Sequence, residues 1–354
     1  MRQNWKFSTI DRAAARVITF AFAFAMVCSA APAQTTFDKP LAGPELEGPI
    51  GPTVQKEPND ADSSGENTAS QATGKPADLA YGAYQRGYYL TALELALPRA
   101  SSGDPAAQTL IAEIYWNGTG VAQDRKKAAE WYKFAASAGN TSAQFAWGNI
   151  LLRGEVVKAD IEKGRAALTA AAEAGHVRAA FNLAQVITAS RPTWAGFKEA
   201  KPWYEQAAYG GLADAQYAMA NILADAKGVV TNDEPGARLW LSKAAAGGLD
   251  TAQLDYAIWL ANGRGGPKDE TAALSWFQRA AAQNNVLAQN RLARMYAFGI
   301  GTGVDKIKSA AWQVVARRAG HNDPQLDARF ADLAEIDQRR AIELANRLVR
   351  RVGN

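Results

Sequence analysis

Cysteine is nearly absent from this chain, whose 354 residues include only Cys28. A single cysteine cannot close an intramolecular disulfide, and it cannot supply the paired thiolates of a zinc site. Cys28 also lies in a segment that we expect to be removed on export, so we expect the mature protein to have no thiol nucleophile. Its stability must then come from packing alone.

Histidine is scarce as well, since His176 and His321 are the only two. Each directly follows a glycine that closes a repeat, and we interpret both as turn residues. Without a spaced set of histidine, cysteine and carboxylate side chains, we expect no metal site and no cofactor. The nucleophile-elbow, zinc-protease and P-loop motifs are also missing. We therefore expect no enzyme activity and no catalytic residue; a carboxylate pair acting in hydrolysis is the alternative, and no pair is singled out.

Long hydrophobic runs are missing apart from residues 17–31, which follow four basic residues. This run is shorter than the roughly 20 residues that span a bilayer. It ends at Ala31-Pro32-Ala33, which has the form of a signal-peptidase site. We predict that residues 1–33 are a cleavable signal peptide and that the chain is periplasmic or secreted, with no membrane span after cleavage. An uncleaved inner-membrane anchor is the alternative.

Large apolar side chains are rare in residues 34–74, which contain five prolines, two basic and seven acidic residues. This composition cannot offset the entropy of ordering, so we predict a disordered linker. Residues 75–354 carry 33 basic and 27 acidic residues. So small an excess over this length forms no polybasic patch, and we expect no nucleic-acid partner.

A repeat of 36 residues is what the chain does have. An alanine-led pair recurs at steps of 36, 36, 36, 37 and 36 residues, and the residue that closes each unit keeps the same phase. Self-similarity at this period is typical of a solenoid, in which each unit packs only on its neighbours. The pairs begin at Ala107, Ala143, Ala179, Ala215, Ala252 and Ala288, and the units close at Gly139, Gly175, Gly211, Gly248, Asn284 and Gly320.

Each unit is predicted to contain two antiparallel helices, which we call helix A and helix B. Apolar residues at helical spacing, such as Ile111 and Ile114, predict helix A. An aspartate such as Asp124 suits the start of helix B, since it can accept the first free N–H groups, and the closing glycine suits its end. Five of the ten tryptophans stand eight residues before a closing position, and we interpret them as the seam between units rather than a sugar- or base-stacking ladder. These are Trp131, Trp203, Trp240, Trp276 and Trp312.

The alanine-glutamine start, the loop Gly118–Val121, the following aspartate, the pair Trp131-Tyr132 and the A-A-x-x-G close resemble the Sel-one-like repeat (SLR) family, a relative of the tetratricopeptide repeat. The resemblance covers residues 105–321. It implies an all-α, right-handed αα solenoid of about six helix pairs. We expect N-terminal capping helices at 75–104 and a C-terminal capping helix or helix pair at 322–354.

Two units depart from the family pattern. Unit two has Ala167-Leu168 where the aromatic pair belongs, and unit three has Ser190–Trp194 in place of the glycine loop. Local bends or a recognition feature at these units are the interpretations left open.

A binding face is predicted on the side of helix A that is not used in packing. In tetratricopeptide-like arrays this helix lines the concave surface, so the resemblance implies an aromatic row beside an amide row there. Amides suit an extended peptide backbone, and aromatic rings suit its side chains. The alternative is that the aromatic rings complete the interhelix core. The predicted partner-binding residues are Thr109, Glu113, Trp116, Phe145, Asn149, Phe181, Gln185, Tyr217 and Asn221.

The resemblance to exported SLR proteins implies a periplasmic protein–protein interaction module. One branch of the family regulates an envelope partner such as the periplasmic domain of a sensor kinase. Other branches act in envelope assembly or host contact. A cell-wall or β-lactam hydrolase, as described for cysteine-rich relatives, is the alternative from another functional class.

Overall fold

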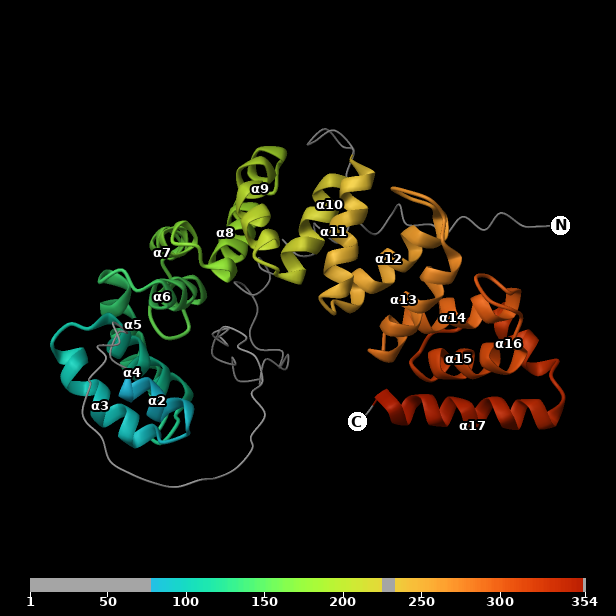
Figure 1. The fold of residues 1–354 in the computed structure, drawn as a ribbon, viewed down its shortest axis with the longest axis horizontal. Coiled ribbons are helices and arrows are strands. Elements are labelled where there is room, and N and C mark those ends of the chain that lie inside the picture. Colours follow the sequence, from blue (N-terminus) through green and yellow to red (C-terminus); the bar gives the residue numbers. More distant parts are fainter. Residues whose placement is uncertain (1–77, 225–232, 353–354) are drawn as a thin grey trace, which may run out of the picture. The chain divides into compact units, whose positions relative to one another are not determined.

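The computed structural model describes residues 78–224 and 233–352, so the predicted signal peptide and linker lie outside the described residues. Sixteen helices and no strand are found in this part of the chain (Figure 1). The chain divides between Asp160 and Ile161 into two compact units, which we call the N-terminal and C-terminal units.

The helices follow one another with short connections. Those of the N-terminal unit are α2 (Leu79–Gln85), α3 (Tyr89–Ser101), α4 (Pro105–Asn117), α5 (Arg125–Ser137) and α6 (Thr141–Arg153). Those of the C-terminal unit are α7 (Ile161–Glu173), α8 (Val177–Ser190), α9 (Trp194–Tyr209), α10 (Ala213–Ala224), α11 (Glu234–Ala246), α12 (Asp250–Asn262), α13 (Glu270–Ala282), α14 (Val286–Phe298), α15 (Lys306–Arg318), α16 (Pro324–Ala331) and α17 (Glu335–Val352).

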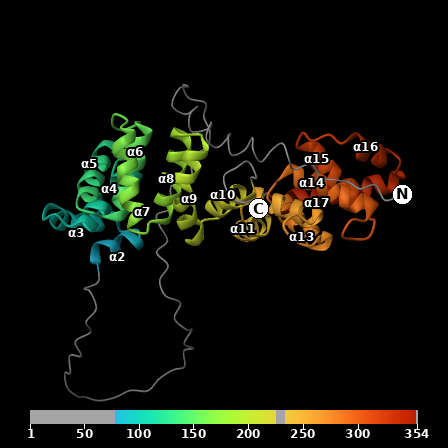
Figure 2. The same ribbon diagram turned by 90° about the horizontal axis from the view of Figure 1, so that it is seen from above.

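The order and bounds of the helices match the predicted repeat, which confirms an all-α solenoid of about six repeats. Helix A is α4, α6, α8, α10, α12 or α14, and helix B is α5, α7, α9, α11, α13 or α15. Figure 1 shows α12 beside α13, and both views show α14 beside α15 (Figures 1 and 2). Unit three keeps its helix pair, with α9 beginning directly at Trp194 instead of after a glycine loop.

The ends of helix B behave as predicted. The carboxylate of Asp124 accepts a hydrogen bond from the backbone N–H of Lys127 at 2.9 Å, and Asp233, Asp269 and Asp305 make the equivalent bond. Each closing residue has a left-handed φ, which glycine adopts without a steric penalty. Asn284 is the one non-glycine among them, with φ at 63°.

In five of the six repeats a glutamine joins helix A to the helix before it. The amide of Gln108 donates to the carbonyl of Ala100 at 3.1 Å, and Gln144, Gln216, Gln253 and Gln289 make the same contact eight residues upstream. A helix leaves its last carbonyls without partners, so this donor satisfies one of them. The alanine-glutamine start of these five repeats therefore caps the end of the preceding helix.

Unit three lacks this glutamine, because Ala180 stands in its place. There the amide of Gln206, on α9, donates to the carbonyl of Ala172 at 2.6 Å. Ala172 also lies eight residues before the missing glutamine. A side chain from the following helix thus satisfies the same carbonyl from a different direction.

The tryptophan column lies between successive helix pairs, as predicted. Trp131 packs against two neighbouring core clusters of the N-terminal unit, one from α2–α4 and one from α4–α6. Trp240 is 8% exposed and meets Tyr209 edge-on, with ring centroids 5.1 Å apart. The small residues on helix A are all buried beside this seam: Ala112, Gly148, Ala184, Ala220, Ala257 and Ala293.

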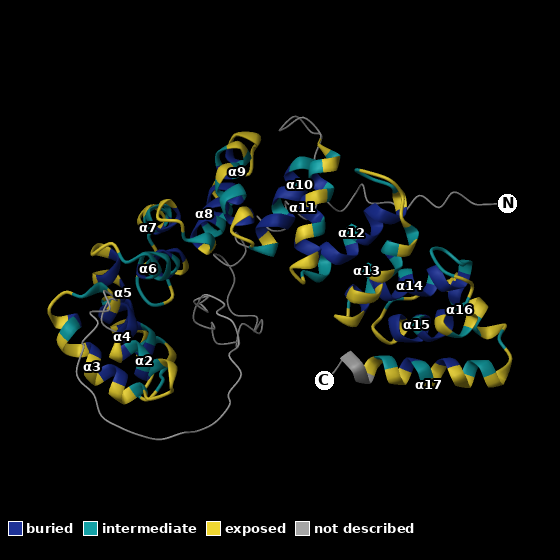
Figure 3. Cartoon of the chain, viewed as in Figure 1, coloured by how far each residue is buried: buried dark blue, intermediate teal, exposed yellow. Residues whose placement is uncertain are grey.

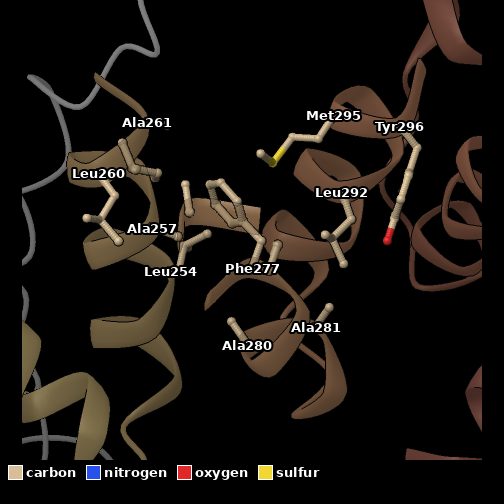
Figure 4. Close-up of a cluster of buried hydrophobic side chains, with 13 residues drawn as sticks. Leu254, Ala257, Leu260, Ala261, Phe277, Ala280, Ala281, Leu292, Met295 and Tyr296 are labelled. Carbon is tan, nitrogen blue, oxygen red and sulfur yellow. The ribbon is translucent and has the colours of Figure 1, made fainter. Parts of the chain in front are cut away.

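One cluster shows how the helices of neighbouring repeats bury the core of a repeat. Phe277 on α13 is fully buried between Leu254 and Ala257 of α12 and Leu292 and Met295 of α14 (Figure 4). Helix B thus fills the space between two successive A helices.

The second glycine of the loop between helix A and helix B also contacts the preceding unit. A Cβ atom on Gly301 would lie 2.2 Å from the backbone oxygen of Glu270, the first residue of α13. Gly265 stands in the same relation to Glu234, and a Cβ atom on Gly120 would lie 2.8 Å from the Cβ atom of Tyr89. The sequence suggested only a turn residue here, whereas the structure shows a close contact between successive repeats.

Gly301→Ala is therefore expected to destabilise the C-terminal unit. Gly301 has φ at +65°, and a left-handed alanine costs roughly 1–2 kcal/mol before the overlap with Glu270 is added. Gly303→Ala is the matched control, since no atom lies within 4 Å of its Cβ position, and it should change stability by less than about 1 kcal/mol. Urea unfolding of the two variants compares them, and equal midpoints would contradict the contact.

Two helices lie at each end of the repeat array. Helices α2 and α3 lie in the segment in which we predicted N-terminal capping helices. The C-terminal segment contains the helix pair α16 and α17. α17 packs along α15 through Ala341 and Ala345, which are fully buried. Figure 3 shows buried and exposed residues alternating along α17, as expected for a helix with one covered face.

Candidate functional site

The nine predicted partner-binding residues lie on four A helices. Five belong to the N-terminal unit and four to the C-terminal unit, so the two groups are described separately. Seven of the nine side chains are partly exposed, and two are buried.

Thr109 on α4 is one of the buried residues, at 7% exposure. Its hydroxyl donates to the carbonyl of Pro105 at 2.7 Å, one turn earlier in the same helix. Sequence spacing placed Thr109 on an open face, but the neighbouring helices cover it. It offers little surface to a partner.

Trp116 is partly buried at the end of α4. Its ring meets Tyr132 of α5 edge-on, with centroids 6.1 Å apart, and the guanidinium of Arg125 lies 5.5 Å from the ring centroid. Trp116 therefore contributes to the packing of α4 on α5 while one part of the ring stays accessible.

Glu113 lies one turn before Trp116 and is also partly buried. Burial raises the pKa of its carboxyl group to about 7. It interacts electrostatically with the phenols of Tyr84 and Tyr132, whose own pKa values are raised first by burial and then by Glu113. At neutral pH this carboxyl group is thus a mixture of protonated and ionised forms.

On α6, Phe145 and Asn149 are both partly exposed. The amide nitrogen of Asn149 donates to the carbonyl of Phe145 at 2.9 Å, which fixes the orientation of the side chain. An amide side chain of this kind both donates and accepts hydrogen bonds.

In the C-terminal unit, the aromatic row is tied to neighbouring helices. Phe181 on α8 meets Tyr204 of α9 edge-on at 5.8 Å. Tyr217 on α10 is 9% exposed, and its hydroxyl donates to a carboxylate oxygen of Asp255 on α12 at 2.6 Å. Tyr217 joins two successive units and, like Thr109, has little surface left for a partner.

The amide row is more accessible than the aromatic row. Gln185 on α8 and Asn221 on α10 are partly exposed, as Asn149 is in the N-terminal unit. These residues can donate and accept, which suits the backbone of an extended peptide. Binding of a partner by the nine residues stays a prediction.

The last A helix carries a polar network that sequence reasoning missed. Asp323 is 5% exposed and accepts hydrogen bonds from Asn290 at 2.9 Å and from Arg294 at 2.7 Å. Asn290 and Arg294 occupy the same two rows of α14 as the aromatic and amide residues. Here the C-terminal helices cover the two rows, and Asn290 and Arg294 hold the start of α16 through Asp323.

The described residues were expected to hold no metal ion. In the described part of the chain, no three His, Cys, Asp or Glu side chains gather in a way that could hold a metal ion. His176 caps α8, because its Nδ1 accepts the backbone N–H of Ala179 at 3.1 Å, and burial lowers its pKa. Within residues 78–224 and 233–352, no helix combines the length and apolar character needed to cross a bilayer.

The chain is similar to known repeat proteins. A Sel1 repeat protein from Oxalobacter formigenes is 30% identical over 68% of this chain and 98% of its own, with a TM-score of 0.58. A protective antigen of uropathogenic Escherichia coli that displays an SLR fold is 26% identical over 77% of this chain, with a TM-score of 0.64. The chain spans 61% of that antigen's length. No curated protein matches the chain.

The sequence profile of the Sel1 repeat matches in six places. The third match is the shortest and begins after the helix A of unit three, the unit whose loop departs from the pattern. The matched residues are 105–140, 141–176, 197–212, 213–249, 251–285 and 286–312. Proteins built from these repeats generally mediate protein–protein interaction rather than catalysis. The chain belongs to the Sel1 repeat family.

Proposed function

We propose that this chain is an exported protein-interaction module that binds an envelope protein along its A helices. The observation that carries the proposal is the row of partly exposed amide side chains Asn149, Gln185 and Asn221, which recurs with the repeat. Each of these amides can hydrogen-bond the backbone of a peptide, whatever the partner's side chains are.

The narrower proposal is a regulator that binds the periplasmic domain of an envelope sensor. It rests on the predicted signal peptide in residues 1–33 and on the family's role in protein interaction. Host contact is the second candidate, because one structural relative is a protective antigen of a pathogenic bacterium. Fractionation of cells decides the compartment: retention in the cytoplasm would contradict both.

Site-specific photocrosslinking tests the proposed face. A photoreactive residue placed at Asn149, Gln185 or Asn221 in the full chain should capture the same envelope protein from each position. Control positions on helix B, such as the exposed Glu130 and Ser275, should not capture it. Capture with equal yield from both sets, or from neither, would contradict a helix A binding face.

Crosslinking is preferable here to replacing the aromatic row by alanine. Tyr217 is buried and bonded to Asp255, so its removal would disturb the packing of two units and confuse lost binding with lost structure. The hydrolase alternative is tested on the same preparation with a chromogenic β-lactam and with cell-wall fragments. Turnover that survives repurification would contradict the proposal.

A further inference from the structure

Glu113 differs from its equivalents along helix A. The same row continues as Asn149, Gln185, Asn221, Ile258 and Arg294, so Glu113 is its only acidic member. Among the residues that the structure describes, no donor forms a hydrogen bond or an ion pair with its carboxylate. A partly buried carboxylate without such a donor is unfavourable when ionised.

Aromatic residues from three helices lie near this carboxylate. Tyr84 comes from α2, Trp116 lies one turn along α4, and Tyr132 comes from α5. Trp116 and Tyr132 are in edge-to-face contact at 6.1 Å. All of these helices belong to the N-terminal unit, so the cluster is formed within one compact body.

A guanidinium group of the chain itself already lies against one ring of the cluster. Arg125 at the start of α5 lies over the Trp116 ring, 5.5 Å from its centroid, yet it makes no ion pair with Glu113. The ring therefore accepts a cation, while the carboxylate beside it is left without one. A second cation that reached both groups would satisfy the carboxylate and gain the ring contacts.

Arginine fits this arrangement better than lysine. A guanidinium group donates two parallel N–H bonds to one carboxylate, and its flat face stacks on aromatic rings. It also holds water less strongly than an ammonium group, so a partly buried site costs it less hydration.

We propose that Glu113, together with Tyr84, Trp116 and Tyr132, receives an arginine side chain of the partner protein. This inference rests on the proposed function and names one chemical feature of the partner. Glu113 would thus add one charged contact, made within the N-terminal unit, to the backbone contacts of the amides.

Titration of the full chain with Nα-acetyl-arginine amide tests the site without the partner. The indole N–H of Trp116 should shift in the NMR spectrum on addition of this probe, and Nα-acetyl-norleucine amide should leave it unchanged. Affinity should rise about tenfold from pH 6 to pH 8, because the carboxyl group ionises in this range. Tyr84 and Tyr132 stay neutral there, since the pKa of each phenol is raised above 10.

The variant Glu113→Gln should lose about tenfold in affinity at pH 8 and lose the pH dependence. Glu130→Gln is the matched control, since Glu130 is an exposed acid on α5 and should bind as wild type does. Equal affinity in Glu113→Gln, no shift in the wild type, or equally tight binding of Nα-acetyl-lysine amide would overturn the proposal.

The captured partner separates this proposal from the proposed function. A partner that binds wild type and is released by Glu113→Gln supports both. A partner held equally by the two leaves the interaction function standing and overturns the arginine site. Failure of wild type to capture any partner would contradict the proposed function itself, whatever the probe titration shows.

Discussion

Replacing Phe277 by alanine should destabilise the C-terminal unit by about 3–5 kcal/mol. Phe277 is fully buried on α13 and contacts side chains of α12 and α14, so its removal leaves a cavity between two repeats. Neighbouring units of a solenoid stabilise one another only through such contacts. Hydrogen exchange of the amide groups in α12–α14 measures the loss where it arises.

Phe134→Ala is the matched control for this prediction. Phe134 lies on helix B of another repeat and is 58% exposed, and its ring meets Trp131 edge-on with centroids 6.3 Å apart. Its removal should cost less than about 1.5 kcal/mol. Similar losses in the two variants would show that the cores between repeats contribute less than the burial of Phe277 indicates.

The second large effect is expected at Asp323, at the end of the array. Asp323→Ala removes the acceptor for Arg294 and Asn290, and Arg294 is itself only 19% exposed in its side chain. Breaking a buried ion pair from one side typically costs about 3–5 kcal/mol, because the remaining charge is left in a poorly solvated place. We expect α16 and α17 to loosen first, since Asp323 also caps α16.

The pH dependence of this loss has a definite sign. Burial alone would raise the pKa of Asp323, but the hydrogen bond from Asn290 and the charge of Arg294 outweigh it and hold the pKa below its ordinary value. The carboxylate therefore stabilises the fold above the unfolded-state pKa of about 3.9, and this contribution disappears as the pH falls through the folded value.

Asp323→Asn measures this contribution, because it keeps the shape of the side chain and removes the charge. Urea unfolding should show a stability gap between wild type and Asp323→Asn at pH 7 that shrinks below pH ~4. A gap that stays constant with pH would mean that the charge of Asp323 does not contribute.

The repeat in the sequence predicted the helix pairs because each structural role recurs in phase. The aspartate that starts helix B and the residue with left-handed φ at its end depend on local backbone geometry, which the local sequence determines. Gln108 and its equivalents also recur, yet their role was not predicted. Their acceptor lies across a turn, and only the folded chain shows which carbonyl each amide reaches.

Contacts between repeats were the hardest to predict. Gln206 replaces the missing glutamine of unit three from the opposite direction, and no pattern within one unit indicates such a substitution. The same limit applied to the predicted binding face. Helical spacing put Thr109 and Tyr217 on an open side of helix A, but adjacent helices cover the first and Asp255 of the next unit binds the second.

The affinity of the captured partner for the full chain tests the central claim, that this protein binds through its A helices. Wild type is compared by calorimetry with a variant carrying Asn149→Ala, Gln185→Ala and Asn221→Ala, and with a control carrying Glu130→Ala and Ser275→Ala on helix B. We predict at least about tenfold weaker binding for the helix A variant with an unchanged melting temperature, and wild-type affinity for the control. Equal affinity of the helix A variant and wild type would contradict the claim.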